Sequence, residues 1–94
     1  MKVKVSDYIA NFYAKKGIEV AFVLTGGCII HFIDSIAQNE DIKYIPMLHE
    51  QSAAMAADAY ARISNKPGLV ATTSGPGATN LLTGICCSYY DSCL

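Results

Sequence analysis

The sequence has little charge, no basic cluster and no long apolar run, and each shortage excludes a class of protein. Only 16% of the 94 residues are charged, and the net charge is −1. Nucleic acid is not an expected partner, because phosphate binding needs a positive stripe. Residues 67–90 carry no charge, but glycines, threonines and Asn80 interrupt them before they reach the ~20 apolar residues that span a membrane. We therefore expect no membrane partner.

Cysteine pairs with the spacing of redox or metal motifs are also lacking. The four cysteines form no C-x-x-C pair, and no His, Cys and Asp cluster has metal-ligand spacing. The first residues are charged and amphipathic, without the apolar segment of a secretion signal. These features predict a cytoplasmic protein with no metal site of its own and with unpaired, buried thiols. The cysteines are Cys28, Cys86, Cys87 and Cys93.

Apolar residues are abundant, and along the chain their spacing alternates between the period of a helix and that of a strand. Ser6 is a plausible helix N-cap and Gly17 a plausible helix end. The order α-β-α-β-α-β-α predicts an α/β fold with a parallel sheet and helices on both faces. The expected helices cover residues 5–16, 29–37, 51–63 and 80–90, and the expected strands cover 20–24, 42–48 and 69–73.

The balance of apolar and charged residues predicts more buried surface than a chain of this size readily covers. Hydrophobic residues make up 52% of the sequence, whereas its charged fraction is well below the typical ~25%. A sheet of three parallel strands is also thin for a class that is covered on both faces. We therefore expect a truncated domain, a homo-oligomer, or both.

Glycines and a carboxylate follow the three expected strands. Gly26 and Gly27 follow the first, Glu50 the second, and the turn from Gly75 to Asn80 the third. The carboxyl ends of parallel strands form the edge where open α/β sheets bind ligands. Glycines let a backbone approach a ligand, and amides at a helix start can face an anion. This shared position predicts a binding site.

Structural alternatives exist for each of these residues. The glycine turns can be ordinary strand-to-helix connections, and Glu50 can be a first-turn glutamate favoured by the helix dipole. His31 and His49 are read as packed or hydrogen-bonded side chains. The G-x-G-x-x-N text of Gly75 to Asn80 lacks the third glycine of a dinucleotide fingerprint and the Lys-Ser/Thr pair of a P-loop. A small nucleotide-binding domain is therefore a minor alternative.

Taken together, the motifs resemble the pyrimidine-binding (PYR) domain of thiamine-diphosphate enzymes, in the group of acetolactate synthase, pyruvate oxidase and benzoylformate decarboxylase. The likeness covers nearly the whole chain. It is carried by L-T-G-G at residues 24–27, by H-E-Q-S-A-A-M-A-A-D-A-Y-A-R at 49–62, and by S-G-P-G-A-T-N at 74–80. The resemblance implies a truncated thiamine-diphosphate-binding fold, with residues 1–94 as the incomplete N-terminal part of that domain.

The resemblance also implies a role for each site residue. Glu50 would be catalytic, binding N1′ of the cofactor's aminopyrimidine and favouring the imino form whose N4′ removes the thiazolium C2 proton. Gly26 and Gly27 would line the reaction space. Pro76, Gly77 and Asn80 would lie against the pyrimidine or a partner subunit. The implied activity is decarboxylation or carboligation of a 2-keto acid such as pyruvate.

The same likeness implies partners outside these residues. Mg²⁺ and the cofactor's diphosphate would be held by a separate diphosphate-binding domain or subunit, because its Gly-Asp-Gly motif is absent here. FAD is possible in the family but is not indicated. The chain alone is expected to be inactive, and the alternative is a catalytically silent fragment or interaction subunit.

Overall fold

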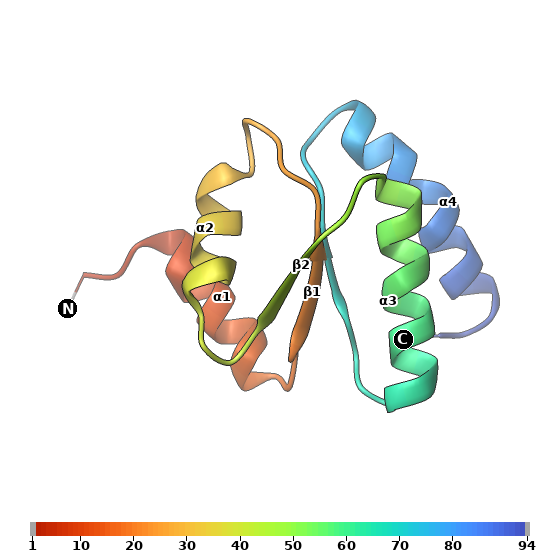
Figure 1. Ribbon diagram of the computed structural model, residues 1–94, viewed down its shortest axis with the longest axis horizontal. Helices are drawn as coiled ribbons and strands as arrows, with labels where there is room; N and C mark the ends of the chain where they lie inside the picture. Colours follow the sequence, from red (N-terminus) through yellow and green to blue (C-terminus); the bar gives the residue numbers. More distant parts are fainter. Residues whose placement is uncertain (1, 94) are drawn as a thin grey trace.

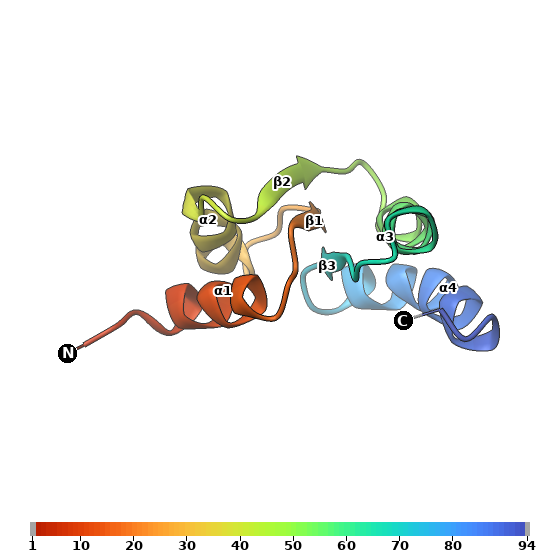
Figure 2. The same ribbon diagram turned by 90° about the horizontal axis from the view of Figure 1, so that it is seen from below.

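Three parallel strands lie at the centre of the computed structural model, with helices on both faces (Figures 1 and 2). The structure describes residues 2–93. The predicted fold class and element order are therefore confirmed. In chain order the elements are α1 (Val5–Lys15), β1 (Val20–Val23), α2 (Ile30–Gln38), β2 (Lys43–Pro46), α3 (Glu50–Ser64), β3 (Leu69–Ala71) and α4 (Pro76–Tyr90).

The strand order is β2-β1-β3, so β1 is central. Phe22 of β1 aligns with Ile45 of β2 and with Val70 of β3. Burial of the apolar strand β1 between two neighbours matches the expectation for a parallel core strand. Pro46 ends β2 at one edge of this sheet, as expected for a residue that cannot donate a ladder hydrogen bond.

The alternation of side chains along β1 divides the core into two clusters. Ala21 and Val23 point to the face covered by α1 and α2, where they pack with Ile36. Phe22 points to the opposite face and packs with Ala53 and Ala57 of α3. Successive side chains of a strand point to opposite faces, so one four-residue strand serves both clusters. The small side chains of α3 let this helix approach the sheet closely.

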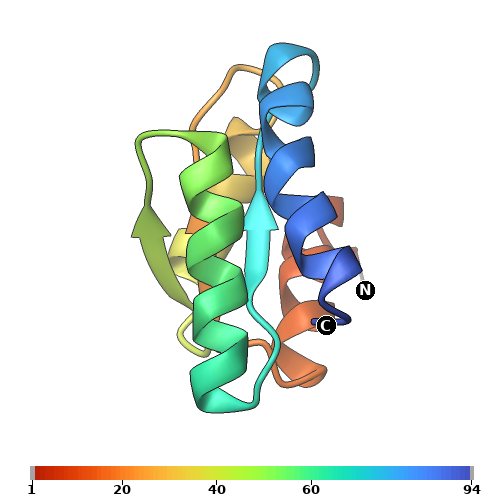
Figure 3. The same ribbon diagram turned by 90° about the vertical axis from the view of Figure 1, so that its right-hand side faces the viewer.

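Helix α4 packs on α3 along its length (Figure 3). The closest approach is at Gly84, where an added Cβ would overlap with the Cβ of Ala54. Polar contacts fix the far end of the pair. Asp58 of α3 accepts hydrogen bonds from Arg62 and from Ser88, the latter at 2.7 Å. Glycine and alanine therefore set the helix separation, and Asp58 sets the position of the α4 carboxyl end.

The ends of the helices follow local rules, and two of them depart from the sequence expectations. Gly17 ends α1 at φ +92°, as predicted, with hydrogen bonds from Gly17 N–H to Ala14 O and from Ile18 N–H to Tyr13 O. Ser6 is not the N-cap, because α1 begins at Val5 and Ser6 Oγ instead accepts a hydrogen bond from Ser35. Helix α4 starts at Pro76 rather than Asn80, because proline's fixed φ suits a first helical position.

The thiols were expected to be buried, and the structure contradicts this expectation for three of the four. Cys28, Cys86 and Cys87 are exposed, and Cys93 is half-buried. Cys86 and Cys87 lie on α4, a helix that also leaves Leu82 and Tyr90 exposed. Within residues 2–93 no helix is long and apolar enough to cross a membrane.

Candidate functional site

The three strands end at one edge of the sheet, and the loops that follow them lie together there (upper part of Figure 1). Gly26 and Gly27 lie in the loop after β1, Glu50 begins the helix that follows β2, and Gly75 to Gly77 form the start of the helix that follows β3. The parallel pairing of the strands produces this arrangement. The structure thus places these residues at the carboxyl end of the parallel sheet, the position at which open α/β sheets in general bind ligands.

Glu50 is the first residue of α3 and is half-buried. His49 caps the helix, because its Nδ1 accepts a hydrogen bond from Gln51 N–H at 3.1 Å. The structural interpretation of His49 is therefore confirmed. An acidic residue is common in the first turn of a helix, so Glu50 also has an ordinary structural place at the start of α3.

Gly77 lies beside the Glu50 carboxylate. A Cβ built on Gly77 would stand 3.5 Å from Glu50 Oε1, an ordinary van der Waals distance, and 3.0 Å from Thr73 Cγ2. Gly77 is itself buried. The absence of a side chain at this position lets the start of α4 pack close to Glu50, so the two predicted residues meet although they follow different strands.

Gly26 joins the same cluster through a residue that the sequence analysis did not single out. A Cβ on Gly26 would lie 2.5 Å from Thr73 Cβ, so the Thr73 side chain occupies the space beside Gly26. Gly27 stands apart, since a Cβ built there would meet nothing within 4 Å. The only sequence signal for Thr73 is its position at the end of a strand, two residues before a glycine.

Pro76 and Asn80 belong to the first turns of α4 and are both exposed. Gly75 precedes them as the N-cap, with φ +74° and ψ −130°, a conformation that favours glycine. Thr79 N–H donates to Gly75 O at 3.1 Å and closes the turn. The Gly-Pro-Gly text therefore forms a helix start whose amides face the same edge as Glu50.

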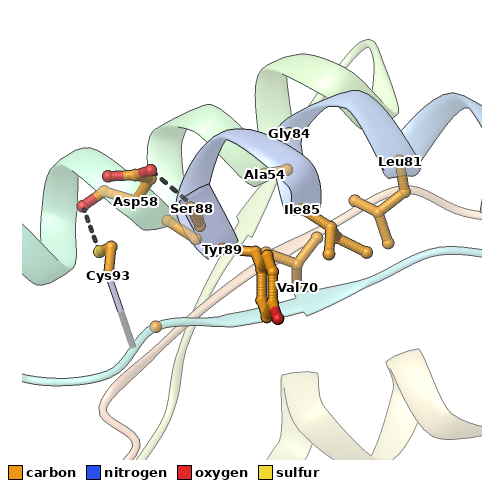
Figure 4. Close-up of a pocket in the computed structure, with 11 residues that line it drawn as sticks. Ala54, Asp58, Val70, Leu81, Gly84, Ile85, Ser88, Tyr89 and Cys93 are labelled. Carbon is orange, nitrogen blue, oxygen red and sulfur yellow. Dashed lines mark hydrogen bonds between the residues drawn. The ribbon is translucent and has the colours of Figure 1, made fainter. Parts of the chain in front are cut away.

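A separate apolar groove of ≈ 440 Å³ lies away from this edge, between α4 and β3. Figure 4 shows Leu81, Ile85 and Tyr89 of α4 on the side of the helix toward Val70 of β3. Asp58 borders this groove, and hydrogen bonds from Arg62 and Ser88 lower its pKa from 3.8 to about 2. These hydrogen bonds hold the Asp58 carboxylate in the contact between α3 and α4.

Within residues 2–93 no cluster of three or more His, Cys, Asp or Glu could hold a metal ion.

An open parallel sheet with a carboxylate and glycine turns at its carboxyl edge defines a ligand-binding α/β domain. A model of the thiamine pyrophosphate enzyme N-terminal TPP-binding domain matches residues 3–93. The chain belongs to this family of thiamine-pyrophosphate enzymes. The predicted resemblance is therefore confirmed.

Curated relatives narrow the likeness to acetolactate synthases. The chain is 41% identical over 90 residues to a probable acetolactate synthase large subunit of Methanocaldococcus jannaschii, covering 96% of this chain and 15% of that protein. It is 46% identical over 87 residues to the acetolactate synthase large subunit of Lactococcus lactis, covering 93% and 15%. With the chloroplastic acetolactate synthase of Arabidopsis thaliana it shares 36% over 89 residues, covering 95% and 13%. The chain thus spans about 15% of the length of the relatives it matches.

Proposed function

We propose that this chain binds the aminopyrimidine of thiamine diphosphate as the N-terminal part of a PYR domain, in an acetolactate synthase-like enzyme that acts on a 2-keto acid such as pyruvate. The observation that carries the proposal is the proximity of Glu50 to Gly77 at the carboxyl end of the sheet, where a Cβ on Gly77 would stand 3.5 Å from Glu50 Oε1. Family membership supports thiamine diphosphate as the cofactor. Family membership favours this function over the binding of a nucleotide by the Gly75 to Asn80 turn.

The residues present fit one end of the cofactor. Glu50 offers a carboxylate at the edge of the core, suited to a hydrogen bond with the ring atom N1′. Gly26 and Gly77 carry no side chains, so their backbone would be free to approach the cofactor closely beside Thr73, which packs against both. When bound, thiamine diphosphate supplies the electron sink for decarboxylation of the keto acid. Glu50 would hold the proton at N1′, and the partly buried setting would strengthen that hydrogen bond.

The other end of the cofactor needs groups that residues 2–93 do not offer. Mg²⁺, which would bridge the protein to the diphosphate, calls for carboxylates and other oxygen ligands, and no cluster of three or more His, Cys, Asp or Glu exists in this range. We therefore assign Mg²⁺ to a diphosphate-binding domain or subunit, and we assign no flavin role to these residues. Assembly with that domain, or as a homo-oligomer, would complete the site at the sheet edge.

A chimera tests this proposal. Residues 3–93 would replace the matching segment of the Methanocaldococcus jannaschii relative, to which the chain is 41% identical over 90 residues. We expect acetolactate formation from pyruvate that depends on thiamine diphosphate and Mg²⁺. A folded but inactive chimera would contradict the proposal. Calorimetry on the 94-residue chain alone addresses the silent-fragment alternative, because tight binding of thiamine diphosphate without a partner would exclude it.

A further inference from the structure

Two loops of the candidate site meet at a single side chain, that of Thr73. It lies two residues after β3, between the loop that follows β1 and the start of α4. Thr73 Cγ2 is 2.8 Å from the Cβ position of Gly26 and 3.0 Å from that of Gly77. Both distances are shorter than ordinary contacts between real Cβ atoms. One methyl group therefore fills the space that both glycines leave empty.

Thr73 packs against Gly26 and Gly77 but not against the other glycines of the same two segments. A Cβ at Gly27 or at Gly75 would meet nothing within 4 Å, so neighbouring positions in the same two loops have room. Gly26 and Gly77 lack side chains, and Thr73 occupies the resulting gap. Close-packed contacts of this kind transmit displacements, because protein interiors have few voids to absorb them.

The same contact reaches Glu50 through Gly77. The Cβ position of Gly77 lies 3.0 Å from Thr73 Cγ2 on one side and 3.5 Å from Glu50 Oε1 on the other. A shift of the α4 start toward or away from Thr73 would therefore change the space beside the carboxylate. Removal of the Thr73 branches would let the loop after β1 and the start of α4 approach each other.

We infer that Thr73 is a positioning residue, a spacer that fixes the separation of the Gly26 loop and the Gly77 helix start and thereby the width of the pyrimidine site beside Glu50. The geometric part stands on the contacts alone, whereas the link to pyrimidine binding rests on the proposed function. Shape is the property that matters, since both branches of the side chain lie close to the Cβ position of Gly26.

The test compares Thr73→Ala, which removes both branches, with Thr73→Val, which keeps the branched shape. Ser74→Ala is the matched control, because Ser74 is the exposed neighbour. In the ¹⁵N-labelled chain, Thr73→Ala should shift the amide signals of Gly26 and Gly77 together, and Thr73→Val and Ser74→Ala should leave both near their wild-type positions. If Thr73→Ala leaves either glycine amide unmoved, the spacer role is wrong.

The effect of Thr73 on the pyrimidine site is tested by measuring the affinity of the chimera for the cofactor. Thr73→Ala should weaken thiamine diphosphate binding about tenfold or more, because small misplacements at a site are costly, and Thr73→Val should restore most of the affinity. Equal losses in both variants would overturn the inference. A wild-type chimera that binds no thiamine diphosphate would overturn the proposed function instead, and the amide signals would still decide whether Thr73 couples the two loops.

Discussion

The Glu50 carboxylate lies against a position that has no side chain, Gly77. A Cβ there would be 3.5 Å from Glu50 Oε1, so an alanine would touch the carboxylate and a branched residue would cover it. These two residues come from different strand-to-helix loops and are far apart in the sequence. Their proximity turns two separate motifs into one candidate site.

We predict that Gly77→Val lowers the thiamine diphosphate-dependent turnover of the chimera by at least ~100-fold, since its branches would fill the space beside Glu50. Ala78→Val is the matched control. It adds the same valine one position further along α4, where the side chain is exposed. Steady-state rates at saturating pyruvate measure the difference. Equal activity of the two variants would show that the space beside Glu50 is not used.

The fold and much of the candidate site at the carboxyl end of the sheet could be predicted from the sequence, because periodicity and glycine turns are local signals. The sequence located Gly26, Glu50 and Gly77 at strand ends, and the parallel sheet brought those ends together. It could not supply Thr73, whose role depends on contacts between loops that are distant in the chain. Side-chain packing between elements has no periodic signature.

The start of the last helix and the exposure of the thiols also could not be predicted from local sequence signals. The expected start of the last helix fell at Asn80, because the Gly-Pro-Gly turn masked a proline at the first helical position. The thiols of Cys86 and Cys87 were expected to be buried, and the structure leaves them exposed. Periodicity identifies an apolar face, but it does not say whether another element covers that face.

The crowded contact at Gly26 predicts a stability difference between adjacent glycines. Gly26→Ala should destabilise the chain by about 1–3 kcal/mol, because the added Cβ would overlap with the Thr73 side chain. Gly27→Ala should change the free energy of unfolding by less than about 0.5 kcal/mol, as expected for a position with open space. Urea unfolding of both variants measures the difference. Equal stability would contradict the close packing of Thr73 on Gly26.

The contact between α3 and α4 predicts a compensating pair. Gly84→Ala should destabilise the chain, although alanine is the better helix former by about 1 kcal/mol, because its Cβ would overlap with that of Ala54. Ala54→Gly in the same chain should restore part of the loss. Thermal unfolding of the single and double variants measures the interaction free energy between the two positions. Independent effects of the two substitutions would show that these helices do not touch at this point.

The carboxylate of Asp58 predicts a loss of stability in acid. Its pKa is about 2 in the folded chain and 3.8 in an ordinary setting, so the unfolded chain binds a proton first as the pH falls. The stabilisation is complete above about pH 4 and is lost as the pH falls through about 2. Urea unfolding between pH 2 and 5 should show this decline.

Asp58→Asn should weaken that decline, because asparagine does not titrate. Asp34→Asn is the control, since it removes an exposed ion pair with Lys4 and leaves Asp58 intact. The control should therefore keep the pH dependence contributed by Asp58. If Asp58→Asn kept the wild-type decline between pH 4 and 2, the hydrogen bonds from Arg62 and Ser88 would not be its cause.

The central claim is that Glu50 activates thiamine diphosphate, and one measurement tests it most directly. Acetolactate formation from pyruvate would be compared in the wild-type chimera, in its Glu50→Gln variant and in a Glu40→Gln control that alters an exposed carboxylate. Glutamine keeps the size of the side chain but cannot hold the proton at N1′, so we predict a fall in kcat of about 10²-fold or more for Glu50→Gln and none for the control. Unchanged turnover in Glu50→Gln, with thiamine diphosphate still bound, would contradict the claim.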